Sequence, residues 1–379
     1  MKLLSISFEE FKGQPREWIL NEAQFGQINL IVGKNSTGKT RLLNIINGLA
    51  RLISAEQNGL YESGKYLASF DFSGQNYIYK LDIEKFHVKN ESLSIDGKEV
   101  LSRDQTGEGK IYAEELQTQL RFQTPTTELA AVYRRDSIQH PFLEELYNWG
   151  KTTKHYLFGS EFGRNVLSSK NTLKKESTDI SKNIVDPNYV IGIFESALKK
   201  HGDKFKDSVL TDFESLGYSC NDVLVTDISE YIAENRLLFG LAVQEKDLDT
   251  ITPQISMSQG MFRALALVIQ LNYNVFEKKP VTILVDDIGE GLDYSRSSNT
   301  ILLLIEKASK NNFQLLMTTN DRFVMNAVDL KYWSILNRSG SSVTVYNEEN
   351  SPDEFEDFKF IGLSNFDFFS NDYFLGDNQ

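Results

Sequence analysis

The sequence predicts an α/β protein with a parallel central sheet. Two apolar runs, Ile28–Val32 and Val281–Val285, are nearly continuous rather than alternating, which is typical of parallel strands buried on both faces. The first run leads through a glycine-rich turn into apolar residues at helical spacing between Thr40 and Ser54. A strand, a turn and a helix therefore follow one another. Residues 67–102 alternate between apolar and polar side chains instead, which indicates an attached antiparallel meander.

The N-terminal elements are expected to be strands. Residues 2–8 alternate weakly, and residues 18–20 form a short apolar piece before the first buried run. Within the meander, Asp96-Gly97 is a hairpin-turn dipeptide, because both residue types tolerate positive φ. These observations assign residues 1–102 to the N-terminal part of the main domain.

Residues 103–235 are expected to be mixed and mostly helical. Apolar residues at helical spacing cover 141–157 and 189–216. A stretch rich in Ser, Lys and Thr between them, 168–183, is expected to be an exposed loop. No heptad pattern persists, so the sequence predicts no long coiled-coil arm. We interpret this region as an insertion into the main domain.

The last third returns to strands and helices in alternation. Apolar runs at 237–243 and 313–317 predict further strands, with a helix at 297–308. Residues 236–350 are therefore assigned to the C-terminal part of the main domain, and 351–379 to an aromatic and acidic tail. The phenylalanines of this tail are expected to pack back onto the domain.

Composition limits the function. The 379 residues carry a formal net charge of −13, which argues against a surface that is basic throughout and built for nucleic acid. The single cysteine, Cys220, excludes an intrachain disulfide and a cysteine-based zinc site. No apolar run reaches the length of a membrane span, and acidic residues occupy the N-terminal region where a signal peptide needs an apolar centre. We therefore expect a cytoplasmic protein without a membrane span.

Residues 33–40 match the phosphate-binding motif G-x-x-x-x-G-K-[ST] in full. The motif comprises Gly33-Lys34-Asn35-Ser36-Thr37-Gly38-Lys39-Thr40. Its glycines let backbone N–H groups curl around phosphates, and the helix that follows adds the positive end of its dipole. Lys39 is expected to reach the β- and γ-phosphates of ATP, and the hydroxyl of Thr40 to bind Mg²⁺.

Two carboxylates end the second buried strand. Asp286 and Asp287 directly follow the run at 281–285. Open α/β sheets bind their ligands at the carboxyl ends of strands. We expect Asp286 to hold Mg²⁺ and Asp287 to orient or deprotonate the water that attacks the γ-phosphate.

Three more segments complete a pattern. They are Ser258-Gln259-Gly260-Met261-Phe262-Arg263 before the two acids, Ile288-Gly289-Glu290-Gly291-Leu292-Asp293 after them, and Leu316-Met317-Thr318-Thr319-Asn320 farther on. With the phosphate loop, and in this order, they resemble the signature, D-loop and switch motifs of ABC-type ATPases of the RecF, SMC and OLD-like branch. That branch includes AAA-family ATP-binding proteins of bacterial anti-phage defence systems. The resemblance spans residues 28–320.

The resemblance implies a fold and a mechanism. The fold is an ABC-type P-loop ATPase head, split in sequence, that binds ATP and Mg²⁺. Two heads would meet face to face with two ATP molecules between them, so the protein would be a homodimer held through ATP. Ser258 and Gly260 of one head would contact the γ-phosphate bound by Lys39 of the other. Asp293 would lie at the same interface.

The chain departs from the family in its hydrolysis residues. Asp287 stands where the family has glutamate, and Asn320 stands where it has the switch histidine. Gln123 is a candidate for the family's Q-loop glutamine, and a polar residue at the end of a strand is the other interpretation. These departures predict slow hydrolysis with intact nucleotide binding. Glu290, three residues after Asp287, stays open as an alternative base.

The expected function is that of an ATP-gated sensor. The residues after Asn320 are too few for the Toprim nuclease domain of OLD proteins, so the ATPase would regulate a separate effector, a nuclease or a toxin, in anti-phage defence. The alternative is a RecF-like ATPase of DNA repair or chromosome maintenance that binds DNA directly. Arg134, Arg135, Lys151 and Lys154 could form a local basic patch for that purpose. A nonhydrolysing structural subunit is a third possibility.

Overall fold

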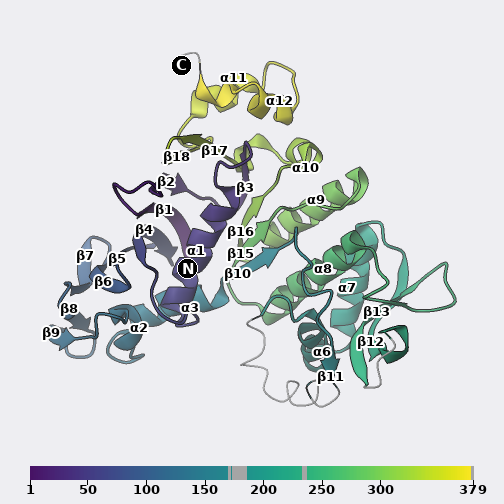
Figure 1. Cartoon of the computed structure of the whole chain (residues 1–379), viewed down its shortest axis with the longest axis horizontal. Coiled ribbons are helices and arrows are strands. Elements are labelled where there is room, and N and C mark those ends of the chain that lie inside the picture. The colour runs from purple at the N-terminus through teal and green to yellow at the C-terminus, as the bar shows by residue number, and fades with distance from the viewer. Residues whose placement is uncertain (170–171, 173–185, 233–236, 377–379) are drawn as a thin grey trace.

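The computed structural model is built around one large β-sheet (Figure 1). The structure describes residues 1–169, 172, 186–232 and 237–376. Within these residues the sheet has 14 strands in the order β10-β15-β16-β3-β17-β18-β2-β1-β4-β5-β6-β7-β8-β9. Their bounds are β1 Lys2–Glu10, β2 Trp18–Gln24, β3 Ile28–Gly33, β4 Ser63–Phe72, β5 Gln75–Glu84, β6 His87–Ile95, β7 Lys98–Arg103, β8 Glu108–Ala113, β9 Thr118–Gln123, β10 Lys154–Leu157, β15 Val281–Asp286, β16 Phe313–Thr318, β17 Trp333–Ser339 and β18 Ser342–Tyr346.

One end of the sheet is parallel, as the sequence predicts. β10, β15, β16, β3 and β17 pair in parallel, one beside the next. Every residue of β3, β15 and β16 is buried, because helices cover both faces of this part. The carboxyl ends of these strands therefore meet at one edge of the molecule, and the loops that follow them lie close together.

The other end is an antiparallel meander that is longer than the sequence predicts. β4 to β9 pair as successive hairpins, so the meander continues past residue 102 to Gln123. The alternation of apolar residues fades in β9, because β9 is the edge strand and none of its residues is buried. An edge strand of this kind has no apolar pattern for a sequence reading to detect.

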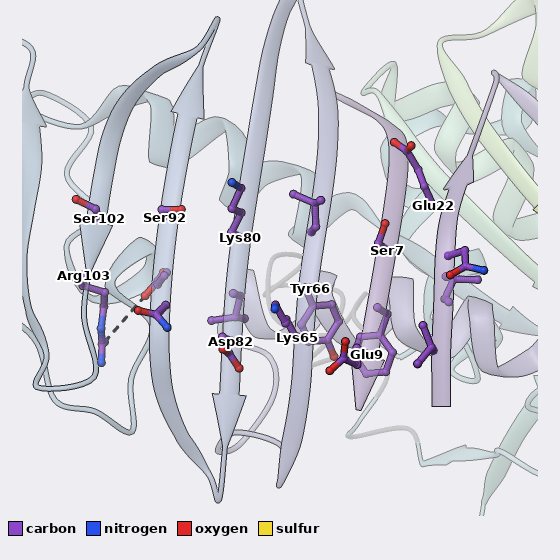
Figure 2. Close-up of a pocket in the computed structure, with 18 of the residues that line it drawn as sticks. Ser7, Glu9, Glu22, Lys65, Tyr66, Lys80, Asp82, Ser92, Ser102 and Arg103 are labelled. Atoms are coloured by element: carbon purple, nitrogen blue, oxygen red, sulfur yellow. Dashed lines mark ion pairs between the residues drawn. The ribbon is translucent and has the colours of Figure 1, made fainter. Parts of the chain in front are cut away.

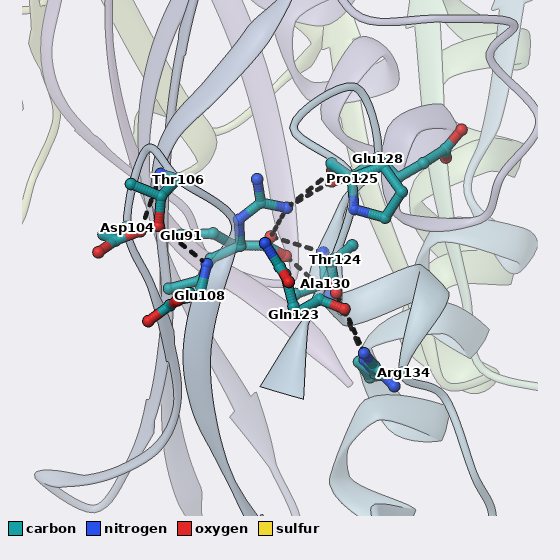
Figure 3. Close-up of polar contacts among 12 residues, drawn as sticks. Glu91, Asp104, Thr106, Glu108, Gln123, Thr124, Pro125, Glu128, Ala130 and Arg134 are labelled. Carbon is teal, nitrogen blue, oxygen red and sulfur yellow. Dashed lines mark hydrogen bonds and ion pairs between the residues drawn. The ribbon is translucent and has the colours of Figure 1, made fainter. Parts of the chain in front are cut away.

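A buried carboxylate ties the meander to a short helix, α2 (Ala130–Tyr133). Glu91 of β6 accepts backbone N–H bonds from Ala130 and Ala131 at 2.7 and 2.8 Å (Figure 3). The hydroxyl of Tyr79 donates to the same carboxylate at 2.9 Å. Glu91 thus supplies acceptors to the free N–H groups at the start of α2, which fixes the turn from β9 back toward the main domain.

Helices cover the two faces of the parallel part (Figure 1). α1 (Lys39–Ile53) and α3 (Pro141–Thr152) pack with Ile31, Leu284 and Leu316 on one face. On the other face the core includes residues of α6, α7, α8 and α9. The bounds of this second group are α6 Val190–His201, α7 Asp203–Ser215, α8 Gln259–Glu277 and α9 Tyr294–Lys310.

The region at 103–235 contains strands as well as the helices that the sequence predicts. β8, β9 and β10 belong to the large sheet, and the apolar spacing at 141–157 covers a helix that ends at Thr152 and a strand that begins at Lys154. The spacing at 189–216 covers α6 and α7, which are separated at Gly202, where φ is 63°. The polar segment predicted as a loop at 168–183 lies almost wholly outside the described residues.

A second, smaller sheet packs on the helical side. Its strands, β11 Ser168–Ser169, β12 Cys220–Asp227, β13 Leu238–Glu245 and β14 Thr252–Pro253, are arranged as β11-β13-β12 with β14 also paired to β13. A short 3₁₀ helix, η1 (Ser229–Ile232), follows β12. β13 is the strand predicted at 237–243. The chain passes from β14 into α8, so this small sheet leads directly into the signature segment.

The aromatic tail packs back onto the domain, as predicted. After β16 come α10 (Arg322–Ala327) and η2 (Leu330–Tyr332), and after β18 come α11 (Pro352–Phe358), α12 (Asn365–Ser370) and η3 (Tyr373–Leu375). Phe355, Phe358, Phe368 and Phe374 are buried in the same core as α8 and α9. None of the helices in the described residues has both the length and the apolarity to cross a membrane.

Candidate nucleotide site

The phosphate loop joins β3 to α1. Ser36 and Gly38 adopt left-handed backbone conformations, with φ of 66° and 110°. The hydroxyl and the N–H of Thr37 both donate to the carbonyl of Lys34, at 2.9 and 3.3 Å. Asn35 and Ser36 are exposed at the tip of this closed turn. A turn of this kind at a helix N-terminus gathers backbone N–H groups for a phosphate.

Two positions in the loop require glycine. A Cβ atom at Gly38 would lie 3.0 Å from the ring of Trp18, and its φ is one that other residues rarely adopt. A Cβ atom at Gly33 would lie 2.6 Å from the hydroxyl oxygen of Thr37 and 3.0 Å from the carbonyl oxygen of Leu336. Both glycines therefore allow close backbone approach, in agreement with the motif.

The ammonium group of Lys39 lies inside the loop. Its Nζ donates to the carbonyl of Gly33 at 2.7 Å, and the residue is only 7% exposed. Burial lowers the pKa of Lys39, and the nearby carboxylates of Asp287 and Asp286 oppose that shift. The charge that would contact the β- and γ-phosphates is thus close to the two acids that follow β15.

Thr40 and Asp286 form an oxygen site suited to Mg²⁺. The hydroxyl of Thr40 lies 3.2 Å from Oδ1 of Asp286, so residues 246 positions apart meet at the end of the sheet. Among the described residues, no group of three or more His, Cys, Asp or Glu side chains could hold a metal. Mg²⁺ is commonly held by one or two protein oxygens together with phosphates and water, so these residues fit Mg²⁺ bound with a nucleotide.

Asp287 is held in an unusual backbone conformation. Its φ is 55°, in the left-handed region that few residues other than glycine, asparagine and aspartate adopt. Its N–H donates to the hydroxyl of Thr318 at 2.9 Å. Burial raises the pKa of Asp287, and the carboxylates of Asp286 and Glu290 raise it further. A carboxylate with a raised pKa next to a phosphate site is a suitable general base.

Glu290 and Asn320 lie next to Asp287. The amide of Asn320 approaches Oδ1 of Asp287 at 3.5 Å. Gly159, in the loop after β10, packs closely against Asp287 and Glu290. A Cβ atom at Gly159 would lie 2.6 Å from Oε2 of Glu290 and 3.2 Å from Cβ of Asp287. All three predicted catalytic residues therefore gather at the edge of the sheet that carries the phosphate loop.

The signature segment opens α8. Ser258 is exposed, and its hydroxyl caps the helix by accepting from the N–H of Met261 at 3.2 Å. Gly260 is buried against the D-loop, where a Cβ atom would lie 2.5 Å from the carbonyl oxygen of Gly291. None of the hydrogen bonds among the described residues joins Ser258 to the phosphate loop of its own chain.

Arg263 joins three parts of the site, and the sequence analysis gives it no role. Its guanidinium donates to the carbonyls of Ser160 at 2.7 Å, Gly159 at 2.8 Å and Glu290 at 3.1 Å. The side chain thereby connects α8 to the loop after β10 and to the D-loop. Its place in the S-x-G-x-x-R pattern was visible in the sequence, but the three carbonyls that it binds were not.

Asp293 makes its contacts within its own chain. Its carboxylate caps α9 by accepting from the N–H of Arg296 at 3.0 Å and forms an ion pair with the guanidinium of Arg296 at 2.7 Å. Both side chains are partly exposed. The structure therefore gives Asp293 a role as a helix cap, and its carboxylate stays partly exposed to solvent.

Gln123 lies far from the phosphate loop, and its assignment as a Q-loop residue is wrong. It ends β9, the edge strand at the end of the sheet opposite β10 (Figure 1). Its backbone carbonyl accepts a bond from Arg134. Since ligands gather at the carboxyl ends of the parallel strands, the loop after β10, with Ser160 and Glu161, is the segment that reaches the site. Glu161 accepts from the side chain of Gln259 in the signature at 3.0 Å.

One face of the antiparallel part of the sheet, formed by β1, β2 and β4 to β7, carries a separate groove of about 750 Å³ (Figure 2). Charged side chains of both signs line it, among them Glu9, Lys65, Lys80 and Asp82. No residue of the phosphate loop contributes to its lining. This groove and the nucleotide site are therefore distinct surfaces.

The sequence matches no protein-family model and no curated protein. The structure is similar to an SMC head bound to the C-winged-helix domain of ScpA, with 11% identity, a TM-score of 0.54, and coverage of 91% of this chain and 97% of that chain. A weaker similarity is found to an SMC head domain from Thermotoga maritima, with 13% identity, a TM-score of 0.46, and coverage of 92% of this chain and 99% of that chain. Another is found to an SMC head domain with an extended coiled coil, bound to the C-terminal domain of ScpA derived from Pyrococcus furiosus, with 10% identity, a TM-score of 0.48, and coverage of 94% and 100%. The first of these similarities shows that the chain has the fold of an SMC head domain.

Proposed function

We propose that this protein is an ATPase that works as an ATP-gated dimeric switch. The observation that carries the proposal is the meeting of the phosphate loop with two acids. The ammonium of Lys39, the hydroxyl of Thr40 and the carboxylates of Asp286 and Asp287 come together from the ends of β3 and β15. This combination of one cation, one hydroxyl and two carboxylates is suited to Mg²⁺–ATP.

Each side chain of the site is proposed to have its own role in hydrolysis. Lys39 would bind the β- and γ-phosphate oxygens, and Thr40 and Asp286 would hold Mg²⁺, which neutralises charge that develops on the phosphoryl oxygens. Asp287 would accept a proton as the oxygen of water attacks the γ-phosphorus and the bond to the β-phosphate oxygen breaks. Asn320 would orient the water or the γ-phosphate through its amide.

Hydrolysis is proposed to be slow, so that the ATP-bound state lasts. Aspartate is one methylene shorter than the glutamate of the family, and a displacement of about 1 Å can lower a rate on the order of a hundredfold. Asn320 offers hydrogen bonds but cannot carry a proton as an imidazolium can. Turnover below about 1 s⁻¹, the lower limit for typical phosphoryl-transfer kinases, is expected.

Steady-state phosphate release from wild type, Asp287→Ala and Glu290→Ala tests this part of the proposal. Loss of activity in the Asp287 variant alone supports Asp287 as the base. Loss in the Glu290 variant alone moves the assignment to Glu290. Fast turnover of the wild type contradicts a long-lived ATP state.

The switch is proposed to act on a separate effector protein, in bacterial defence against phage. Support comes from the resemblance to OLD-like ATPases and from the similar SMC head, which is bound to a domain of ScpA. The net charge of −13 favours a protein partner over nucleic acid. A RecF-like role with direct DNA binding is the alternative.

A pull-down with and without ATP separates these functions. A stoichiometric protein partner whose retention depends on ATP supports the switch. Binding to duplex DNA that weakens steeply with added salt supports the RecF-like role, because phosphate contacts release counterions. The Lys39→Ala protein is the matched control, since it should lose the ATP dependence of either interaction.

A further inference from the structure

One buried hydroxyl connects the two acids of the site. Thr318 is the last residue of β16 and is fully buried. Its hydroxyl donates to Oδ1 of Asp286 at 2.5 Å and accepts from the backbone N–H of Asp287 at 2.9 Å. A hydroxyl has one donor proton and two acceptor lone pairs, so Thr318 satisfies both bonds at once.

The same residue supports the left-handed backbone at Asp287. The hydroxyl of Thr318 holds the N–H of Asp287, and its carbonyl accepts the N–H of Ile288 at 2.9 Å. Two consecutive amides of the turn after β15 are thus fixed to the end of β16. A disfavoured φ such as the 55° of Asp287 persists only where surrounding contacts enforce it.

The two hydroxyls on Asp286 are not equivalent. Thr40 is exposed, and its hydroxyl belongs to the oxygen pair that fits Mg²⁺. Thr318 is buried and lies outside that pair, and its bond to Asp286 is the shorter of the two. Both hydroxyls contact the same oxygen, Oδ1 of Asp286. A residue that hydrogen-bonds a metal-binding carboxylate fixes the orientation of that carboxylate.

We propose that Thr318 is the positioning residue that aims Asp286 at Mg²⁺ and fixes Asp287 beside the γ-phosphate, an inference that rests on the proposed ATPase function. The neighbouring Thr319 has a different role, because its hydroxyl donates to the carbonyl of Ile288 and accepts from the N–H of Asp321. Thr319 therefore shapes the loop, while Thr318 alone of the two contacts the acids.

Thr318→Val tests the inference, because valine keeps the shape and removes the hydroxyl. The measurement is binding of a fluorescent, non-hydrolysable ATP analogue, titrated with MgCl₂ and repeated in EDTA. The variant should need about 10- to 100-fold more Mg²⁺ for the same binding, which is the usual effect of losing such a partner. Binding in EDTA should match that of the wild type. Thr318→Ser, which keeps the hydroxyl, should restore most of the Mg²⁺ response.

Thr300→Val is the matched control. Thr300 is also buried, and its hydroxyl bonds a carbonyl within α9, so this variant loses a buried hydroxyl away from the acids. Thr318→Ala serves as the second hydroxyl-free variant if valine prevents folding. A wild-type Mg²⁺ titration in a folded Thr318→Val or Thr318→Ala protein overturns the inference and leaves the ATPase proposal intact. Failure of the wild type itself to bind the analogue overturns the ATPase proposal.

Discussion

At the scale of single residues, charge and backbone conformation are set together in this site. Asp287 combines a raised pKa with a left-handed φ. Lys39 is buried by its own loop, with its ammonium bonded to the carbonyl of Gly33. The spacing of the motifs predicts which residues form the nucleotide site, but it contains no information about their backbone φ angles or their burial.

Lys39→Ala should abolish nucleotide binding and leave the fold intact, because it removes the cation that contacts the β- and γ-phosphates. Isothermal titration with Mg²⁺–ATP measures the effect. Lys34→Ala is the control, because the side chain of Lys34 points to the tail and forms an ion pair with Asp372 at 2.8 Å. Undiminished ATPase activity in Lys39→Ala would contradict the site assignment.

The raised pKa of Asp287 predicts a pH dependence. As the base, Asp287 must be ionised, so turnover should fall on acidification at a pH above the ordinary aspartate value of 3.8. The same shift affects stability. Since the fold favours the protonated form, ionised Asp287 destabilises the fold above its folded-state pKa, and this cost is absent below its unfolded-state pKa.

Asp287→Asn should therefore raise the melting temperature of the nucleotide-free protein at pH 7, on the order of one or two degrees. The gain should shrink as the pH falls toward 4. Asp104→Asn is the contrasting control, because hydrogen bonds from Thr106 lower the pKa of Asp104. Thermal melts across the pH range measure both variants. An Asp287→Asn protein that melts below the wild type at pH 7 would contradict the sign of the argument.

At the scale of helices and strands, burial on both faces decides what the sequence can predict. β3, β15 and β16 are buried along their whole length and mostly apolar, and they are confirmed at their predicted places. β9 has no buried residue, so it shows no apolar periodicity and is missed as a strand. β10 directly follows the apolar spacing of α3, so its residues are taken for a continuation of that helix. The Q-loop assignment failed for the same reason, because it required knowing that β10 borders β15.

The tail helices provide a test at this scale. Phe368 is fully buried, with ring centroids 4.8 Å from Phe355 and 4.7 Å from Phe358. Phe368→Ala should lower the free energy of unfolding by about 3–5 kcal/mol, since it leaves a cavity among packed rings. Phe360→Ala is the matched control, because Phe360 is 83% exposed. Urea unfolding measures both; equal effects would mean that the tail does not share the main core.

At the scale of the whole molecule, the proposed dimer would hold each ATP between the phosphate loop of one head and the signature of the other. These two segments lie at different places on one head. Lys39 and Thr40 belong to the start of α1, whereas Ser258 is exposed at the start of α8. A second copy would bring them together across a nucleotide. Arg263 connects α8 to the loop after β10 and to the D-loop, so the signature helix is hydrogen-bonded to the segment that carries Glu290.

Ser258→Arg should block ATP-dependent pairing of heads, because it places bulk and charge at the surface that would face the partner's γ-phosphate. ATP binding to a single head should survive. Sedimentation with a non-hydrolysable ATP analogue measures pairing, or distance labels measure head closure if the wild type dimerises without ATP. Ser309→Arg, on an exposed position of α9, makes the same substitution elsewhere. An undiminished ATP-dependent dimer would remove Ser258 from the interface.

The strand order of the large sheet has a consequence for how the chain folds during synthesis. β3 lies between β16 and β17, two strands that the ribosome makes almost 300 residues later. Until they emerge, β3 lacks both of its hydrogen-bonding neighbours, so the phosphate loop that follows β3 is not yet held by the sheet. Such long-range pairing slows folding, because the loop-closure entropy is lost before the contacts form. A nascent chain should therefore acquire nucleotide affinity late and abruptly, when β16 and β17 close around β3.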